Sequence, residues 1–265
     1  MKKINLRDGT PIYCLNSIEA HVLDEHIKSY LTYKTNIKEG DTIIDIGANI
    51  GLFGIRLSQL FHNINIHSFE PIPDIYDILH ANSKKSLNKN FKTYMLGISN
   101  EKKEIDFTYF PNSPALSTSK PRIWQQNKVN FLAAVEGSIV NAPEKFWWAK
   151  LIPKFFIPLI AKYLTYNKKV ISNKVISIRD FISENNISEI NLLKIDCEGE
   201  EVNVLRGIGE HQWKIIQCII MEVHNIDNNV NTTKSLLDKK GFKNILIKHE
   251  KGLEKAKLVN IFASK

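Results

Sequence analysis

The residues best placed to do chemistry begin at a glycine turn near position 47. An apolar run from Asp41 enters the turn Asp45-Ile-Gly-Ala-Asn-Ile-Gly51, and the next apolar run ends at Glu70. Glycines in such a turn let the backbone approach a ligand closely, and an acidic residue about twenty positions later can accept hydrogen bonds from both hydroxyls of a ribose. The spacing predicts a nucleotide-type cofactor, with Glu70 as the residue that binds its ribose.

The same turn argues against a dinucleotide. A dinucleotide-binding turn reads Gly-x-Gly-x-x-Gly, whereas Asn49 and Leu52 stand at the second and third glycine positions. Asp45 would also repel a pyrophosphate, but its carboxylate would offset the charges of an ammonium and a sulfonium group. We therefore expect a cationic cofactor such as S-adenosylmethionine, with Asp45 near its amino-acid end, directly or through water.

Five segments, in this order along the chain, resemble the FkbM family of S-adenosylmethionine-dependent methyltransferases. They are residues 44–51, 68–73, 96–99, 192–207 and 221–224, and the similarity covers roughly residues 38–109 and 174–248. The chain departs from the family pattern at Cys197, where an aliphatic residue is more usual, and at Gly97, where alanine is more usual. A long segment at about 110–172 is not required by the family core.

The resemblance implies a fold, a reaction and a set of cofactor-binding residues. The fold is the α/β, Rossmann-like class I methyltransferase fold, with a seven-stranded, mostly parallel sheet that ends in an antiparallel hairpin. The reaction is O-methylation from S-adenosylmethionine in secondary-metabolite or surface-polysaccharide biosynthesis. The matching cofactor-binding positions are Asp45, Gly47, Ala48, Asn49, Gly51, Glu70, Pro71, Gly97, Ser99 and Asp196.

The hydrophobic pattern predicts alternating strands and helices within one domain, residues 1–265. We expect sheet strands at 42–47, 64–69, 91–96, 190–196 and 215–223, and helices at 50–62, after Pro73, at 177–186 and at 199–206. Residues 104–109 alternate like a hairpin partner of the third strand, and 242–248 and 258–263 are typical of a strand pair around a turn at Lys251-Gly252. Residues 1–40 are expected to cover the sheet, and 110–172 to form a helical and aromatic insertion.

Candidate catalytic residues follow the fourth and fifth strands, whose carboxyl ends should meet in one crevice. Asp196 could orient a substrate hydroxyl or the cofactor amine, or cap the following helix. Glu198 could take part in catalysis or only stabilise the start of that helix. His224 could act as the general base, or be a hydrogen-bonded structural group. Cys197 is expected to be a packed thiol rather than a nucleophile.

No metal requirement is expected, because the cysteines and histidines lack the spacing of metal ligands. Asp196, Glu198 and Glu222 could nevertheless supply oxygen ligands to magnesium or calcium if the strand ends converge.

The charge balance leaves several classes of partner open. Lysine and arginine number 36 against 28 acids, a formal net charge of +8, which suits an anionic substrate, nucleic acid or a membrane surface, or simply a solvated lysine surface. Residues 196–199 read Asp-Cys-Glu-Gly, which lacks the Asn/Asp-Pro-Pro-Tyr/Phe clamp of amino-methylating enzymes, and no Pro-Cys nucleophile is present. The resemblance to the FkbM family implies a small-molecule, polyketide-like or glycan acceptor; an RNA methyltransferase and a non-catalytic cofactor-binding module are the alternatives.

The remaining expectations concern location and the aromatic part of the insertion. Three cysteines and a polar start at Met1 favour a cytoplasmic protein. Residues 143–166 are rich in aromatic side chains but interrupted by Lys150, Lys154 and Lys162, which excludes a simple membrane span of about 20 apolar residues. A lid over the acceptor pocket is the favoured interpretation, and a homodimer contact or a peripheral membrane element are the others.

Overall fold

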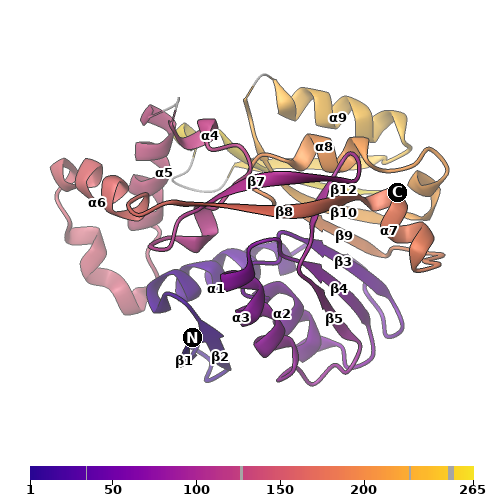
Figure 1. Ribbon diagram of the computed structural model, residues 1–265, viewed down its shortest axis with the longest axis horizontal. Coiled ribbons are helices and arrows are strands. Elements are labelled where there is room, and N and C mark those ends of the chain that lie inside the picture. Colours follow the sequence, from indigo (N-terminus) through magenta and orange to yellow (C-terminus); the bar gives the residue numbers. More distant parts are fainter. Residues whose placement is uncertain (34, 126–127, 227, 250–253) are drawn as a thin grey trace.

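A seven-stranded sheet forms the middle layer of the molecule (Figure 1). The structure, a computed structural model, describes residues 1–33, 35–125, 128–226, 228–249 and 254–265. The strand order is β11-β12-β10-β9-β3-β4-β5. The strands are β3 (Thr42–Ile46), β4 (Asn65–Phe69), β5 (Phe91–Tyr94), β9 (Leu192–Ile195), β10 (Cys218–His224), β11 (Asn244–His249) and β12 (Leu258–Ser264).

All neighbours from β10 to β5 are parallel, and β12 runs antiparallel to both β10 and β11. The predicted seven-stranded, mostly parallel sheet with a terminal antiparallel pair is therefore confirmed. The predicted turn at Lys251-Gly252 lies outside the described residues.

Helices cover both faces of this sheet. On one face lie α1 (Ser17–Leu31), α2 (Leu52–Leu60) and α3 (Pro73–Ser83), which pack with alternate strand residues such as Ile43 and Ile220. On the other face lie α7 (Ile178–Glu184), α8 (Glu201–Arg206) and α9 (Asn229–Lys239), which pack with Ile44 and Ile219. Because both faces are covered, β9 and β10 are buried along their whole length, which explains their nearly continuous apolar sequence.

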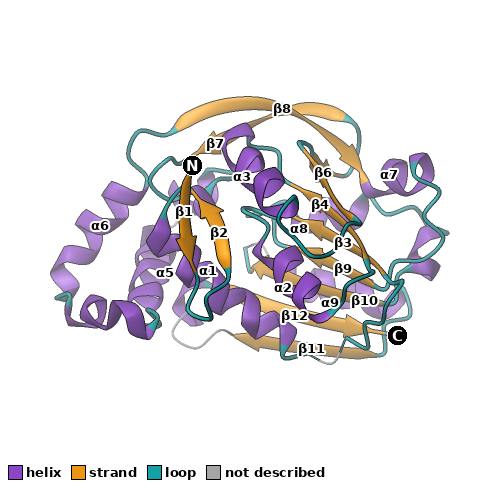
Figure 2. Ribbon diagram, turned by 90° about the horizontal axis from the view of Figure 1, so that it is seen from below, coloured by secondary structure: helices purple, strands orange, loops and turns teal. Residues whose placement is uncertain are grey.

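A second sheet of three strands lies beside the first. It has the order β6-β8-β7, with β6 (Gly97–Ser99), β7 (Lys103–Tyr109) and the nine-residue β8 (Lys169–Ser177). The predicted partner of residues 104–109 was wrong: β7 pairs with β8, in the register Lys103↔Val175 to Tyr109↔Lys169. Figure 2 shows β8 arching over the molecule as a long strand. The alternating pattern identified a strand correctly but carries no information about its partner.

The N-terminal residues pack against α2 and α3. The hairpin of β1 (Lys2–Asn5) and β2 (Pro11–Cys14) is joined to α3 through the side-chain amide of Asn82, which donates to the carbonyl oxygens of Tyr13 and Ile50. In α1, Asp24 forms a buried pair with Arg56 of α2, with nitrogen to oxygen distances of 2.7 and 2.8 Å. The first 40 residues therefore brace the turn before α2.

The chain between β7 and β8 forms the predicted helical insertion. Its elements are η1 (Pro114–Leu116), α4 (Arg122–Gln125), α5 (Lys128–Val140), η2 (Glu144–Leu151), η3 (Lys154–Phe156) and α6 (Ile157–Leu164); η4 (Gln212–Ile215) and η5 (Glu254–Ala256) lie elsewhere. The insertion packs around a small core that includes Phe110, Phe131, Val135 and Ile157 and is completed by Ala256 of η5 and Leu258 of β12. Among the helices described, none combines the length and the apolar character that crossing a membrane requires.

Candidate functional site

A pocket lies at the carboxyl ends of the parallel strands, where open α/β sheets bind their ligands. Part of its wall is made by residues that the sequence singled out, namely Gly47, Asn49, Glu70, Pro71, Gly97, Asp196 and Glu198. The rest is largely apolar and includes Leu96, Ile98, Phe107, Pro114 and Ala115. The structure thus brings together seven predicted site residues from four separate segments of the chain.

The turn after β3 owes its glycine to a close approach of two backbones. Gly47 has φ +72°, and a Cβ atom there would lie 1.7 Å from the carbonyl oxygen of Asp196. The amides of Gly47 and Ala48 donate to the carbonyl oxygen of Phe69, at 3.1 and 2.9 Å. Gly51, at φ +84°, begins α2. The turn is therefore fixed against the ends of β4 and β9. Within it, Gly47 and Asn49 line the pocket.

Glu70 is a buried carboxylate at the wall of the pocket. Its two oxygens accept hydrogen bonds from the amides of Asn49 and Ile72, at 3.2 and 3.0 Å. Burial raises the pKa of Glu70 to about 7, although those two hydrogen bonds oppose the shift. Each carboxylate oxygen can accept more than one hydrogen bond. The chemistry of this group therefore fits the two hydroxyls of a ribose, which would further stabilise the ionised form.

Asp45 lies behind the pocket rather than in its wall. It is completely buried, accepts a hydrogen bond from Ser68, and lies 3.0 Å from the Nζ of Lys194. Lys194 also donates to the carbonyl oxygen of Gly47 at 3.0 Å and lies 3.6 Å from Asp196. Burial opposes its charge, but Asp45 and Asp196 raise the pKa of Lys194 above its usual value.

Sequence reasoning missed Lys194. The visible clue was a lysine inside the otherwise apolar run Leu-Leu-Lys-Ile of β9, because a buried lysine is costly unless it is paired. This lysine lies on β9 and contacts Asp45 on the neighbouring strand β3, behind the pocket wall. The predicted role of Asp45 near the amino-acid end of the cofactor, directly or through water, stays a prediction, and here its oxygens face Lys194 and Ser68.

Three further predicted cofactor residues are buried without lining the pocket. Ala48 and Gly51 belong to the turn backbone, and the hydroxyl of Ser99 donates to Glu200 at 3.1 Å. Gly97 does line the pocket, and a Cβ atom there would lie 2.7 Å from Val175 of β8. The glycine that departs from the family pattern is therefore explained by the packing of β6 against β8.

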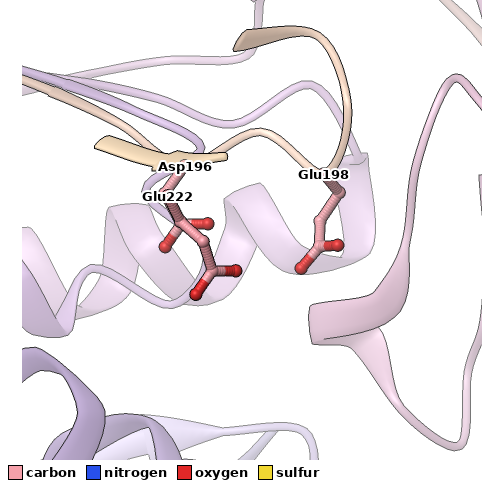
Figure 3. Close-up of side chains that lie close together, drawn as sticks. All are labelled: Asp196, Glu198 and Glu222. Carbon is pink, nitrogen blue, oxygen red and sulfur yellow. The ribbon is translucent and has the colours of Figure 1, made fainter. Parts of the chain in front are cut away.

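Three carboxylates converge beside the pocket (Figure 3). Asp196, Glu198 and Glu222 each place one oxygen within 4.8 Å of the others. Glu222 comes from β10 and is buried, and its partner from α1 is His26, 3.7 Å away. Burial, and then the charge of Asp196, raise the pKa of Glu222 to about 8. These are the three acids that the sequence named as possible ligands of a divalent cation, and they equally suit a cationic ligand.

His224 lies between two carboxylates. Its Nε2 is 3.3 Å from Glu198 and its Nδ1 is 3.6 Å from Glu201. Burial alone would lower the pKa of His224, but hydrogen bonds and charge from the two glutamates raise it well above its usual value. A histidine held in this way keeps its proton at neutral pH. His224 is not among the residues that line the pocket, whereas Glu198 is.

The other residues of the turn after β9 have structural roles. Cys197 reaches the pocket wall, but burial raises the pKa of its thiol well above the usual value, which favours a packed thiol over a nucleophile. Thr118 donates to the carbonyl oxygen of Glu198, and Lys120 donates to that of Gly199 at 2.8 Å. The start of the insertion therefore closes over the Asp196 turn, a contact that no local sequence pattern predicted.

The aromatic part of the insertion lies elsewhere. The insertion residues that line the pocket are Pro114, Ala115, Ser117 and Thr118, and none comes from 143–166. The geometry gives the favoured lid interpretation of 143–166 no support.

Comparisons with known proteins agree on one family. The model of the FkbM methyltransferase domain matches residues 45–244. Methyltransferase sdnD of Sordaria araneosa is 28% identical over 240 residues, which cover 89% of this chain and 86% of that protein. The 31-O-demethyl-FK506 methyltransferase FkbM of Streptomyces tacrolimicus is 25% identical over 245 residues, 91% of this chain and 89% of that one. Hexuronic acid methyltransferase AglP of Haloferax volcanii is 23% identical over 203 residues, 77% and 64% respectively.

The pocket fits the cofactor that the family implies. It offers a buried carboxylate at Glu70, a backbone turn that only glycine can make at position 47, and acids rather than cations at its polar edge. With the family model matching most of its length, the chain belongs to the FkbM methyltransferase family, and it is an enzyme whose cofactor is S-adenosylmethionine.

Proposed function

We propose that this enzyme methylates a hydroxyl oxygen of a small-molecule, polyketide-like or glycan acceptor. The observation that carries the proposal is the pair of carboxylates, Asp196 and Glu198, in the wall of the pocket. Acidic side chains accept hydrogen bonds from a hydroxyl and can receive its proton. The names of two relatives support an oxygen-bearing acceptor, one a 31-O-demethyl compound and the other a hexuronic acid.

The bound cofactor supplies an electrophilic methyl group, and this chain's residues supply orientation and charge. Glu70 would hold the ribose, and the Gly47 to Asn49 backbone would position the cofactor against β3. Asp196 and Glu198 would orient the acceptor hydroxyl and take up its proton. We propose that His224, predicted as the general base, instead acts as a positioning residue: protonated between Glu198 and Glu201, it would hold the Glu198 carboxylate toward the pocket.

A labelled-methyl transfer screen tests the proposal. Purified protein is incubated with S-adenosylmethionine carrying a ¹³C methyl group and with sets of sugars, uronic acids, lipids and polyketide-like alcohols. We expect a methyl ether in the product spectrum, lost in Asp196→Asn while cofactor binding persists. A methyl ester would instead identify a carboxylate as the acceptor and contradict the proposal. Methylation of RNA would favour the nucleic-acid alternative, and cofactor binding without turnover on any acceptor would favour a non-catalytic module.

Metal dependence needs its own measurement, because Asp196, Glu198 and Glu222 lie close enough to share a cation. We propose metal-independent catalysis. Activity that a chelator abolishes and magnesium or calcium restores would overturn this.

We further propose a single domain over residues 1–265 and a cytoplasmic location. The three free cysteines, Cys14, Cys197 and Cys218, are each at least partly buried, which suits a reducing compartment.

A further inference from the structure

One stretch of the insertion, from Trp147 to Tyr163, exposes large apolar side chains. We call it the aromatic surface and define it by Trp147, Trp148, Leu151, Phe155, Leu159 and Tyr163, which are between 48 and 74% exposed. These side chains come from η2, η3 and α6, at the end of the molecule opposite to α7 (Figure 1). Exposed apolar side chains gathered in this way, with charged residues among them, commonly mark an interaction site.

The core of the insertion does not account for the aromatic surface. In α6, Ile157 and Ala161 are buried and belong to the core with Phe131. Leu159 and Tyr163 are offset from them by two residues, about half a helical turn, and therefore lie on the opposite side of the helix. The helix buries one apolar face and leaves a second one exposed.

The first residues of η2 contact Arg7 and helix α1. Arg7 pairs with Glu144, the Nζ of Lys145 lies 3.0 Å from the Nε2 of His21, and the rings of Phe146 and His21 are 5.6 Å apart. These contacts fix the start of η2 against α1 and leave Trp147 and Trp148 on the outside. The aromatic surface is therefore an ordered feature of the fold.

The charges around the aromatic surface have one dominant sign. Lys145, Lys150, Lys154 and Lys162 are exposed within 143–166, where Glu144 is the acid in the sequence. Lys154 pairs with Glu136 of α5 at 2.6 Å, so the net positive charge comes mainly from the other lysines. Two more lysines, Lys168 and Lys169, follow directly. Lysines interleaved with tryptophan, phenylalanine and leucine suit a surface that is apolar inside and negatively charged outside, because the rings enter the acyl boundary while the ammonium groups meet the anionic headgroups.

We propose that the aromatic surface docks the protein onto a membrane that contains anionic lipids. The charge complementarity favours this partner over a second copy of the chain, whose matching lysines would repel across a two-fold interface. The contact is peripheral: the rings insert to the depth of the headgroups, and the pocket at the strand ends stays in water. This interaction does not depend on the identity of the methyl acceptor.

Vesicle co-sedimentation with the full chain tests the proposal. We expect binding to vesicles of phosphatidylcholine mixed with phosphatidylglycerol, weaker binding to phosphatidylcholine alone, and a loss of binding as salt is raised. Tryptophan emission should shift to shorter wavelength on the mixed vesicles, because Trp147 and Trp148 leave water whereas Trp213 is already buried. Absence of binding to the mixed vesicles at low salt would overturn the proposal.

Matched variants assign the binding to this surface. Trp147→Ser/Leu151→Ser/Phe155→Ser and Lys150→Glu/Lys162→Glu should each weaken binding at least tenfold, with the melting temperature and cofactor affinity unchanged. Leu60→Ser/Leu87→Ser and Lys102→Glu/Lys239→Glu, which alter equally exposed residues elsewhere, should bind like the wild type. Equal weakening in the control pairs would contradict the proposal. So would wild-type dimers in sedimentation that the serine variant converts to monomers, since the surface would then be a subunit interface.

Discussion

At the scale of single residues, the site depends on buried charges that are paired within the protein. Glu70 is fixed by two amides, Asp45 by Lys194, and Glu198 by His224. Each of these groups is held in one orientation by a partner, so a ligand would meet a site that is already ordered. Changing one member of a pair should therefore affect its partner as well as the ligand.

Glu70 should make cofactor affinity depend on pH. If Glu70 binds the ribose as proposed, the hydroxyls would donate to the ionised carboxylate. Burial raises the pKa of this group to about 7 in the free protein. Affinity should therefore be highest above pH 7 and fall roughly tenfold for each pH unit below it. Titration calorimetry from pH 6 to pH 8 checks this.

The control for that experiment is Glu70→Gln, which keeps the shape and removes the titration. The variant should bind the cofactor more weakly at pH 8 and show little change with pH. A wild-type dissociation constant that is the same at pH 6 and pH 8 would place the ribose elsewhere.

His224 should influence the acid side of the pH–rate profile. The hydrogen bond from His224 lowers the pKa of Glu198, which burial raises. In His224→Ala that pKa should rise further, so the acid limb of kcat/KM should move to higher pH while cofactor affinity stays constant. Steady-state kinetics on the acceptor found in the screen gives this profile, with the exposed His211→Ala as control.

If His224 were the general base, the outcome would differ. Turnover would then fall by roughly a hundredfold or more at every pH, and the limb would disappear rather than move.

Lys194 should be essential for stability. Lys194→Met leaves Asp45 buried without its cation, and removal of one partner of a buried ion pair typically costs about 3–5 kcal/mol in the free energy of unfolding. Urea denaturation of this variant measures the loss, and Lys92→Met, an exposed lysine on β5, should change stability by less than about 0.5 kcal/mol. A loss that is equally small at Lys194 would contradict a stabilising ion pair between Lys194 and Asp45.

The residues that could be predicted from sequence are those whose role follows from local geometry. Gly47 and Glu70 end consecutive strands, so their convergence follows from the parallel sheet alone. Lys194 and Asp45 meet because β9 lies next to β3 in the sheet. In the sequence these strands are far apart: Lys194 and Gly47, whose carbonyl oxygen it also contacts, are 147 positions apart. That adjacency, and hence the role of the lysine, is a property of the assembled sheet.

At the scale of elements, the small sheet β6-β8-β7 forms one wall of the pocket. Gly97 and Phe107 line the pocket, and Val175 of β8 fills the space that a side chain at position 97 would need. The strand at 104–109 was predictable from its alternation, but its pairing with β8 was not, because about sixty residues of insertion separate the two strands and only tertiary packing brings them together.

Gly97→Ala should destabilise the protein by about 1–3 kcal/mol, as overpacking of a core usually does. Val175→Ala removes the clashing methyl group but also buried apolar volume, so it destabilises on its own. The loss in Gly97→Ala/Val175→Ala should be smaller than the sum of the two single losses by more than about 0.5 kcal/mol, which would show direct coupling between β6 and β8. Thermal or urea unfolding of the two single variants and the double variant gives the cycle. Strictly additive effects would contradict the close packing of these strands.

At the scale of the whole molecule, the acidic residues of the pocket and the positively charged insertion are separate features. The chain carries a net charge of +8, yet the charged residues that line the pocket are the acids Glu70, Asp196, Glu198 and Glu200. The insertion, residues 110–172, has nine basic residues against two acids and so holds most of the positive excess. The excess of lysine is therefore unrelated to the cofactor, whereas the acidic edge favours a cationic one.

The most direct measurement of this account is calorimetric titration of the wild-type protein with S-adenosylmethionine, with its demethylated product and with a nicotinamide dinucleotide. We expect one binding site for the first two compounds and no binding of the dinucleotide. S-adenosylmethionine should bind at least tenfold more weakly to folded Glu70→Ala, because that variant loses hydrogen bonds to a charged group worth about 1.5–3 kcal/mol each. Binding of the dinucleotide in place of S-adenosylmethionine, or an unchanged dissociation constant in Glu70→Ala, would contradict it.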